Sequence, residues 1–408
     1  MRILIAAAGS RGDVDPYTGL GAVLRRAGHE VTVAAPEPFA PLVRRAGLQF
    51  RGLPGRPEAL DGATGRRALM RSAAAFVTEL GRGFADVMDD ATDLLVLSAT
   101  TAPLGRHLAE ATGTPSLGAY LTPTEPTGDF PPVVTGTRSL GRLGNRTAGR
   151  FALRMADRLY DRAVAELRGR LGLPPLGPAA ARRRQEAANR TVLYGFSETL
   201  VPRPADWRAG LEVVGTWWPY VDPAERLPAQ LEDFLTAGPR PVFIGFGSMA
   251  SGDGERLSGL AVAALRRAGL RGVLQSGSAG LAAEGDDVLT VGDVPHALLF
   301  PRVAAVVHHA GAGTSAAALR AGVPSVPVPV TADQPFWAAR LAALGAATRP
   351  FGELIAERLA DALGRAARDG RHAHAAATAA RRMAGEDAVG RTAEVVEGLK
   401  GRRGRVSG

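Results

Sequence analysis

The chain of 408 residues contains no cysteine and a single lysine, Lys400. Without cysteine it can form no disulfide and can offer no thiolate to zinc or to an iron–sulfur cluster. Long apolar runs are also missing: residues 303–319, an uncharged stretch of the second half, contain two histidines and two glycines, so we expect no integral membrane association. The first residues resemble a buried strand and not a signal peptide, and we expect a cytoplasmic location.

The charge is unbalanced, with 49 basic residues against 40 acidic ones and a formal net charge of +9. A basic excess favours an anionic partner, either nucleic acid or a small ligand that carries phosphate. The arginines are scattered, however, without a long basic run or the interleaved aromatic residues that single-strand binding uses. We therefore attribute the excess to a general enrichment in arginine and expect no nucleic-acid partner.

The composition, 46% hydrophobic and 22% charged, is typical of a globular protein with a sizeable core. At about 100–200 residues per domain, the length predicts two domains. A strand pattern at residues 3–8, a helical pattern at residues 18–27 and a strand pattern at residues 30–36 predict one unit with parallel strands. The same rhythm restarts at residues 241–246. The sequence thus predicts two Rossmann-like, doubly wound α/β domains that face each other across a cleft.

The junction between the two domains is marked by a loop rich in tryptophan and proline. We expect an N-terminal domain at residues 1–205, a linker at residues 206–235, a C-terminal domain at residues 236–385, and a closing helix with a basic tail at residues 386–408. Doubly wound sheets bind ligands beyond the carboxyl ends of their strands. Candidate site residues are therefore expected in the loops that follow predicted strands.

The strongest local signal is residues 306–315 (VVHHAGAGTS), a strand pattern followed by a glycine turn and a helix start. The free N–H groups and the positive dipole end of a helix suit a phosphate or diphosphate. Gly311 and Gly313 allow an anion to approach the backbone, and Thr314 and His309 can donate hydrogen bonds to it. We interpret this segment as a diphosphate site, and the alternative is a structural turn with a buried histidine pair.

The same turn also fits the dinucleotide fingerprint, as Gly311-x-Gly313-x-x-Ala316. Asp333 lies twenty residues after Gly313, where a ribose-binding carboxylate would stand. This match favours an NAD(P)-dependent oxidoreductase as the alternative function. Against it, histidines stand where a dinucleotide turn continues an apolar strand, and Asp333 is followed by Gln334, a polar pair that better suits several sugar hydroxyls.

The loop after the first predicted strand carries Ser10 and Asp13. A carboxylate at the carboxyl end of a parallel strand can act as a general base. Asp13 and Asp15 also have the D-x-D spacing of a metal clamp, but the adjacent Pro16 indicates that Asp15 shapes the start of the following helix. We therefore expect no metal at this loop.

Two weaker signals follow strands of the second half. Ser248 places a hydroxyl after the strand at residues 241–246, and the backbone of Val294 and Pro295 can hydrogen-bond the edge of a flat base. Each signal by itself is also compatible with an ordinary loop. Together they surround one predicted crevice.

These pieces, in this order, resemble the GT-B nucleotide-sugar glycosyltransferases of family 1, and among them the bacterial natural-product enzymes related to the vancomycin-group and sterol glucosyltransferases. The matching pieces are residues 9–16, 243–248, 294–296, 308–314 and 333–337. The chain departs from the family pattern at Ala310, where glycine is common. A methyl group there narrows the approach to the phosphate but keeps the N–H.

The resemblance implies an inverting, metal-independent transfer of a sugar from a UDP- or dTDP-linked donor to a small hydrophobic natural product. The donor is a co-substrate, so no cofactor is expected. Asp13 takes the place of the family's catalytic base. The donor diphosphate is expected on Ser10, Ser248, His309, Gly311, Gly313 and Thr314, the sugar on Asp333 and Gln334, and the base on Val294 and Pro295.

The family architecture further implies a closing helix at about residues 386–399 that crosses back to the N-terminal domain. It places the acceptor on that domain, along residues 76–84 and 120–130. We expect a monomer or a homodimer. Besides the oxidoreductase, a nucleotide-sugar epimerase and a catalytically inactive GT-B subunit stay as alternatives, and the retained Asp13, His309 and Asp333 argue against the inactive subunit.

Overall fold

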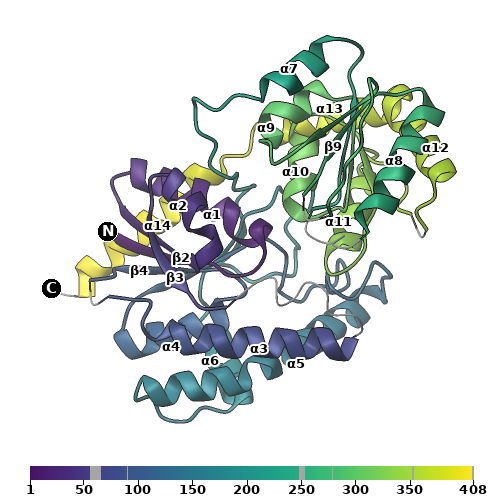
Figure 1. Cartoon of the computed structure of the whole chain (residues 1–408). Coiled ribbons are helices and arrows are strands. Elements are labelled where there is room, and N and C mark those ends of the chain that lie inside the picture. Colours follow the sequence, from purple (N-terminus) through teal and green to yellow (C-terminus); the bar gives the residue numbers. More distant parts are fainter. Residues whose placement is uncertain (56–65, 90, 248–252, 278, 352, 407–408) are drawn as a thin grey trace.

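The computed structural model describes residues 1–55, 66–89, 91–247, 253–277, 279–351 and 353–406. Two α/β domains lie one above the other in Figure 1, one in purple and blue and the other in green and yellow. Each is built on a sheet whose strand pairs are all parallel. The two doubly wound domains predicted from the sequence are confirmed.

The first sheet has seven strands in the order β3-β2-β1-β4-β5-β6-β7. Its strands are β1 (Arg2–Ala6), β2 (Glu30–Pro36), β3 (Gln49–Leu53), β4 (Leu94–Leu97), β5 (Ser116–Tyr120), β6 (Val192–Tyr194) and β7 (Leu211–Val213). The strand β7 lies inside the predicted linker. The first sheet therefore extends past residue 205, because Leu211 and Val213 are buried and complete its core.

Helices cover both faces of this sheet. One face packs against α1 (Arg11–Arg26), α2 (Ala40–Arg45) and the C-terminal α14 (Ala388–Val406). The other packs against α3 (Arg66–Phe84), α4 (Ala102–Thr112) and α5 (Gly141–Arg170), with α6 (Pro178–Ala187) outside them.

The second sheet has five strands in the order β10-β9-β8-β11-β12. They are β8 (Val242–Gly245), β9 (Gly272–Gln275), β10 (Val288–Val291), β11 (Ala305–His308) and β12 (Ser325–Pro327). The surrounding helices are α7 (Ala229–Thr236), α8 (Gly254–Ala268), α9 (His296–Leu299), α10 (Ala312–Arg320), α11 (Gln334–Ala343), α12 (Ala356–Arg368) and α13 (Gly370–Met383). Pro327 lies in the edge strand β12, where the missing N–H of proline is tolerated.

The helix α1 begins at Arg11, seven residues before the start at residue 18 that its pattern predicts. Ser10 is its N-cap, so that Asp13 lies in the first turn and Pro16 lies inside the helix. The prediction that Asp15 shapes the helix start was wrong. The Ser10–Asp13 pair initiates the helix instead, and Pro16 gives up one backbone hydrogen bond in the second turn.

The closing helix α14 crosses back to the N-terminal domain as predicted, and Figure 1 shows it in yellow beside α1 and α2. The indole N–H of the buried Trp217 donates to Thr392 Oγ1 at 3.0 Å, and His29 Nε2 lies 3.1 Å from Glu397 Oε1. Glu386 accepts bonds from the Ser197 hydroxyl at 2.7 Å and from the Thr199 N–H at 3.1 Å. The C-terminal segment from Glu386 to Glu397 is thus tied to the N-terminal domain.

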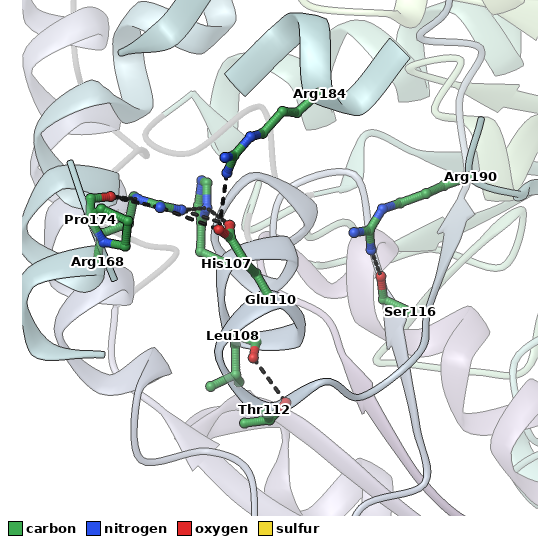
Figure 2. A network of polar contacts seen from close by, with 9 residues as sticks. All are labelled: His107, Leu108, Glu110, Thr112, Ser116, Arg168, Pro174, Arg184 and Arg190. Carbon is green, nitrogen blue, oxygen red and sulfur yellow. Dashed lines mark hydrogen bonds and ion pairs between the residues drawn. The ribbon is translucent and has the colours of Figure 1, made fainter. Parts of the chain in front are cut away.

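A polar network fixes α5 to α4 on the far side of the first sheet (Figure 2). The buried guanidinium of Arg168 donates to Glu110 Oε2 at 2.7 Å, to His107 Nδ1 at 2.9 Å and to the Pro174 carbonyl. Burial and the positive charge of Arg168 lower the pKa of His107, which stays neutral and accepts this bond. Arg184 adds a second cation to Glu110.

Among the described residues, none of the helices combines the length and the hydropathy that a membrane-spanning segment requires.

Candidate functional site

Ser10, Asp13 and the segment around His309 follow strands at the two points where strand order reverses. In the first sheet, β2 and β4 flank β1 on opposite sides, and the Ser10–Asp13 loop leaves the carboxyl end of β1. In the second sheet, β8 and β11 are neighbours whose chains continue to opposite edges. Loops diverge at such switch points and expose backbone and side chains to a ligand.

Ser10 holds one oxygen of the Asp13 carboxylate. Its backbone N–H and its hydroxyl both donate to Asp13 Oδ2 at 2.8 Å. Gly9 adopts φ +137°, and a Cβ there would lie 2.5 Å from the same oxygen, so only glycine fits. Within the described residues, Asp13 Oδ1 has no hydrogen bond and the side chain is exposed. One oxygen is therefore fixed while the other is available.

The pKa of Asp13 is raised above its usual value, chiefly because the surrounding protein removes water from the carboxylate. The two bonds from Ser10 act in the opposite direction. The negative charge of Asp333 raises the pKa further, which brings carboxylates of both domains into one electrostatic environment. A base with a raised pKa binds a proton more readily than an ordinary aspartate does.

The imidazole of His309 packs between two glycines from the loops after β8 and β11. A Cβ at Gly247 would lie 2.7 Å from the His309 ring, and a Cβ at Gly311 would lie 2.5 Å from its Nε2. His309 Nδ1 is buried without a hydrogen-bond partner in the described structure. Burial lowers the pKa of His309 to about 4, so the ring is neutral at pH 7. An unpartnered ring nitrogen at this position can form a hydrogen bond with a polar ligand.

The neighbouring His308 points into the core. Its Nδ1 accepts from the Ala310 N–H at 3.1 Å, so its proton is on Nε2, which has no partner among the described residues. Burial lowers the pKa of His308 to about 3. Ala310 adopts φ +63°, a conformation that favours glycine and accounts for the glycine common at this position.

The helix α10 starts at Ala312, earlier than the predicted start at residue 315, with Gly311 as its N-cap. The N–H groups of its first turn are free of intrahelical partners and point toward the loop. Gly313 is exposed, and a Cβ there would meet nothing within 4 Å. Thr314 lies in the same turn. The free N–H groups of this helix start suit the anion site that the sequence predicts.

Asp333 and Gln334 follow β12 and have different surroundings. Asp333 Oδ2 accepts a 2.7 Å hydrogen bond from the indole N–H of Trp337 one turn later, and burial raises the pKa of Asp333. The Gln334 carbonyl oxygen accepts from the backbone N–H groups of Val330 and Thr331 at 2.7 and 3.1 Å. Gln334 thus shapes the loop, and its amide N–H₂ group is the part left for a ligand.

The predicted base-binding loop joins the two domains. The Val294 side chain is buried in the core, and no backbone hydrogen bond of Val294 occurs within the described residues. Pro295 is the N-cap of α9. The preceding Asp293 forms an ion pair with Arg11, the first residue of α1, which also lies 3.4 Å from Asp15. An ion pair so exposed contributes little stability but orients both loops.

Comparison with known proteins places the whole chain in one group. Residues 3–92 match the family model of the glycosyltransferase family 28 N-terminal domain, and residues 274–400 match the erythromycin biosynthesis protein CIII-like C-terminal domain. The chain is 42% identical over 371 residues to O-mycaminosyltylonolide 6-deoxyallosyltransferase of Streptomyces fradiae, covering 86% of this chain and 85% of the relative. The chain belongs to the GT-B glycosyltransferases of family 1.

Two further comparisons support this assignment to a glycosyltransferase family. Glycosyltransferase GtfE of Amycolatopsis orientalis is 34% identical, with 85% of each chain covered. The crystal structure of the kitacinnamycin glycotransferase superposes with a TM-score of 0.73 at 20% identity over 98% of both chains, which shows the shared fold. The relatives and structural neighbours are glycosyltransferases, and the enzyme class predicted from the sequence is confirmed.

In this glycosyltransferase the predicted residues come from both domains, and the charge of Asp333 acts on the Asp13 carboxylate of the other domain. Asp13 and Ser10 come from the first domain, and His309, Gly311, Gly313, Thr314, Asp333, Gln334, Val294 and Pro295 come from the second. Ser248 lies outside the described residues. Of the acceptor segment predicted at residues 76–84, Phe76 and Phe84 are buried in the hydrophobic core.

Three contacts near the glycosyltransferase site were not predicted from the sequence. Trp337 lies four residues after Asp333, and this spacing on one helix could have indicated the contact. The Arg11–Asp293 pair and the packing of Phe130 on Phe336, with ring centroids 5.2 Å apart, join residues more than 200 positions apart. No local pattern predicts such contacts, because they depend on how the two domains meet.

Proposed function

We propose that this glycosyltransferase transfers a sugar from a UDP- or dTDP-linked donor to a hydroxyl of a small hydrophobic natural product, with inversion at the anomeric carbon. The observation that carries the proposal is the Asp13 carboxylate, held by one oxygen and free at the other, opposite the donor-side residues. The names of similar proteins support the substrate class. They include a tylonolide 6-deoxyallosyltransferase, a glycosyltransferase in complex with dTDP and a rhamnosyltransferase complexed with spinosyn aglycone.

In the proposed reaction, Asp13 accepts the acceptor's hydroxyl proton as that oxygen attacks the anomeric carbon. The new bond forms on one face of the sugar while the bond to the diphosphate oxygen breaks on the other. The raised pKa of Asp13 suits this role, since the carboxylate binds a proton more readily than an ordinary aspartate does. Asp333, whose Oδ2 is fixed by Trp337, would bind a donor-sugar hydroxyl through its other oxygen.

The leaving diphosphate would be stabilised by fixed donors. The N–H groups at the start of α10, the Thr314 hydroxyl and the partnerless His309 nitrogen all belong to the loop after β11. Donors fixed in advance stabilise charge that develops in the transition state without reorganisation. We propose that they make a metal ion unnecessary, and undiminished turnover after chelation with EDTA would support this part.

The acceptor would lie where apolar side chains of both domains meet. Phe130, after β5, packs at a tilted angle against Phe336 of α11, and Val330 is 63% exposed in the loop beside Gln334. An exposed valine next to the donor-sugar residues suits an apolar aglycone. These positions lie beside the predicted segment 120–130 and not along α3.

The test is turnover of Asp13→Asn with UDP- and dTDP-sugars and a panel of macrolide and sterol acceptors. We expect kcat to fall by about 10²–10⁴-fold, since an amide cannot accept the proton, with nucleotide affinity retained. Asp361→Asn, on the exposed face of α12, is the matched control. Unchanged turnover in Asp13→Asn would remove Asp13 from its role, and a wild type that binds nucleotide but transfers no sugar would favour the inactive subunit.

A further inference from the structure

Exposed apolar side chains are concentrated in one segment of the molecule. Seven large hydrophobic side chains of the described residues are exposed, and five of them lie within residues 134–155. They are Val134 (62%), Leu140 (61%), Leu143 (81%), Phe151 (62%) and Met155 (36%). Three of the five belong to the first half of α5. Scattered exposed hydrophobics are ordinary, but such a concentration marks an interaction surface.

The same helix carries an arginine at every fourth position, at residues 142, 146, 150, 154, 158 and 162. A step of four residues advances about 40° around a helix, so the row winds slowly across its surface. The arginines at both ends of this row form ion pairs with carboxylates: Arg142 pairs with Asp129, Arg146 with Asp206 and Arg162 with Glu166.

The three central arginines form no ion pair within 4 Å of a carboxylate among the described residues, although the charge of Arg158 acts on Asp161 one turn later. Arg150 and Arg154 are exposed and make no side-chain contact there, and Arg158 contacts only the Met155 sulfur at 3.7 Å. Residues 138–162 contain seven arginines and two aspartates, a net charge of +5. One of the two, Asp157, is paired with Arg182. The central part of the row is therefore a surface of unbalanced positive charge.

The unpaired arginines and the exposed apolar side chains lie on the same side of α5. We call this surface the α5 basic face, defined by Leu143, Arg150, Phe151, Arg154, Met155 and Arg158. It is about 22 Å long at 1.5 Å per residue. The opposite side of α5 packs against the protein through the buried Asn145, Gly149 and Tyr160. The helix cannot rotate this face inward.

We propose that the α5 basic face docks this protein onto an anionic lipid surface, with Phe151 and Leu143 entering the headgroup region and Arg150 and Arg154 reaching lipid phosphates. Mixed cationic and apolar side chains on one helix face are typical of helices that lie in a membrane interface. The charge supplies complementarity to anionic lipid.

A second copy of the chain fits this face less well, because an isologous contact would bring the unpaired arginines of both copies together. An acidic protein would need a concave surface to receive side chains that project from a convex helix. A fluid lipid surface accommodates them without such a match. Docking does not depend on the sugar-transfer chemistry, and its test needs no substrate.

The test is flotation of the full chain with vesicles of phosphatidylcholine mixed with phosphatidylglycerol, compared with vesicles of phosphatidylcholine alone, at low and high salt. We expect binding to the anionic vesicles only, weakened by salt. Arg150→Gln combined with Arg154→Gln should weaken it by about 5-fold for each arginine removed. Leu143→Ser combined with Phe151→Ser should weaken it at both salt concentrations.

The matched control is Arg358→Gln combined with Arg365→Gln, which removes the same charge from exposed positions of α12. It should bind like the wild type. Equal binding of all variants, or no binding to anionic vesicles, overturns the proposal. The proposal is also overturned if sedimentation velocity shows a wild-type dimer that dissociates in the variant with both Leu143→Ser and Phe151→Ser. Retention of the protein on polyglutamate without binding to lipid would overturn it as well. Unchanged melting temperatures show that the variants fold.

Discussion

The indole N–H of Trp337 donates to Asp333 Oδ2 at 2.7 Å, one helical turn away on α11. Trp337 is fully buried and packs against Phe196 of the other domain, with ring centroids 5.9 Å apart. The bond fixes one oxygen of the Asp333 carboxylate. Under the proposed function, in which Asp333 binds the donor sugar, Trp337 is a positioning residue for that contact.

Trp337→Phe keeps most of the packing but removes the hydrogen bond. We expect kcat/KM for the sugar donor to fall by about 10–100-fold, the range for a lost bond to a charged group. Affinity for the free nucleoside diphosphate, which lacks the sugar, should not change. Isothermal titration with donor and with diphosphate separates the two.

Trp207→Phe is the control for Trp337→Phe. Trp207 is also buried and stacks on Tyr194, but its indole N–H has no partner in the described structure. Trp207→Phe should leave donor affinity unchanged and should lower the stability of the protein about as much as Trp337→Phe does. Equal losses of donor affinity in both variants would mean that Trp337 acts through packing alone.

Ser10→Ala tests the acid limb of the pH profile. Asp13 must be ionised to accept a proton, so kcat/KM rises with pH through its pKa. The Ser10 bonds lower that pKa, and removal of the hydroxyl therefore raises it. In Ser10→Ala the acid limb of the pH profile should move to higher pH. In Ser10→Thr, which keeps the hydroxyl, the acid limb should stay where it is in the wild type. A shift to lower pH would contradict the assigned contact.

His309→Ala should weaken binding of nucleoside diphosphate by about 10–100-fold, because a fixed donor to a charged oxygen is lost. The donor sugar should lose affinity by the same factor, since the contact is with the diphosphate they share. His374→Ala, at an exposed position of α13, serves as the control. Undiminished diphosphate affinity, measured by titration calorimetry, would remove His309 from the anion site.

His308 should make the protein less stable in acid. Its pKa in the folded chain is about 3 against 6.5 for free histidine, so below pH 6.5 the unfolded chain binds a proton that the folded chain excludes. Stability is thus present above pH 6.5 and lost as the pH falls, by up to about 1.4 kcal/mol per pH unit. His296 and His309, with pKa values of about 4, act in the same direction.

Replacement of His308 with Asn keeps an acceptor for the Ala310 N–H but removes the titrating ring. We expect the loss of melting temperature between pH 7 and pH 5 to be smaller in His308→Asn than in the wild type. The raised pKa values of Asp13 and Asp333 oppose the histidines in both proteins, so the difference between the two reports His308. Identical losses would show that His308 is not titrated in this window.

Most of the fold was predictable because its signals are local. Apolar runs bounded by glycine and proline marked β1, β2, β8, β9 and β11, and the parallel sheet followed from their alternation with helical patterns. The start of α1 was missed because Pro16 outweighed the Ser10–Asp13 pair in the pattern, whereas in the structure the cap is satisfied and the proline is tolerated. The strand β7 was missed because three residues in a loop rich in proline leave no periodic signal.

By itself the sequence determined the two α/β domains, the glycine-framed turn before α10 and the carboxylate after β1, because each depends on residues a few positions apart. Only the tertiary structure decided which atoms of these residues are free. It ties Asp13 Oδ2 to Ser10, Asp333 Oδ2 to Trp337 and the Gln334 carbonyl to its own loop. It also buries Phe76 and exposes Phe151. Burial and partners depend on how distant segments pack, and hydropathy alone does not specify which of two phenylalanines meets solvent.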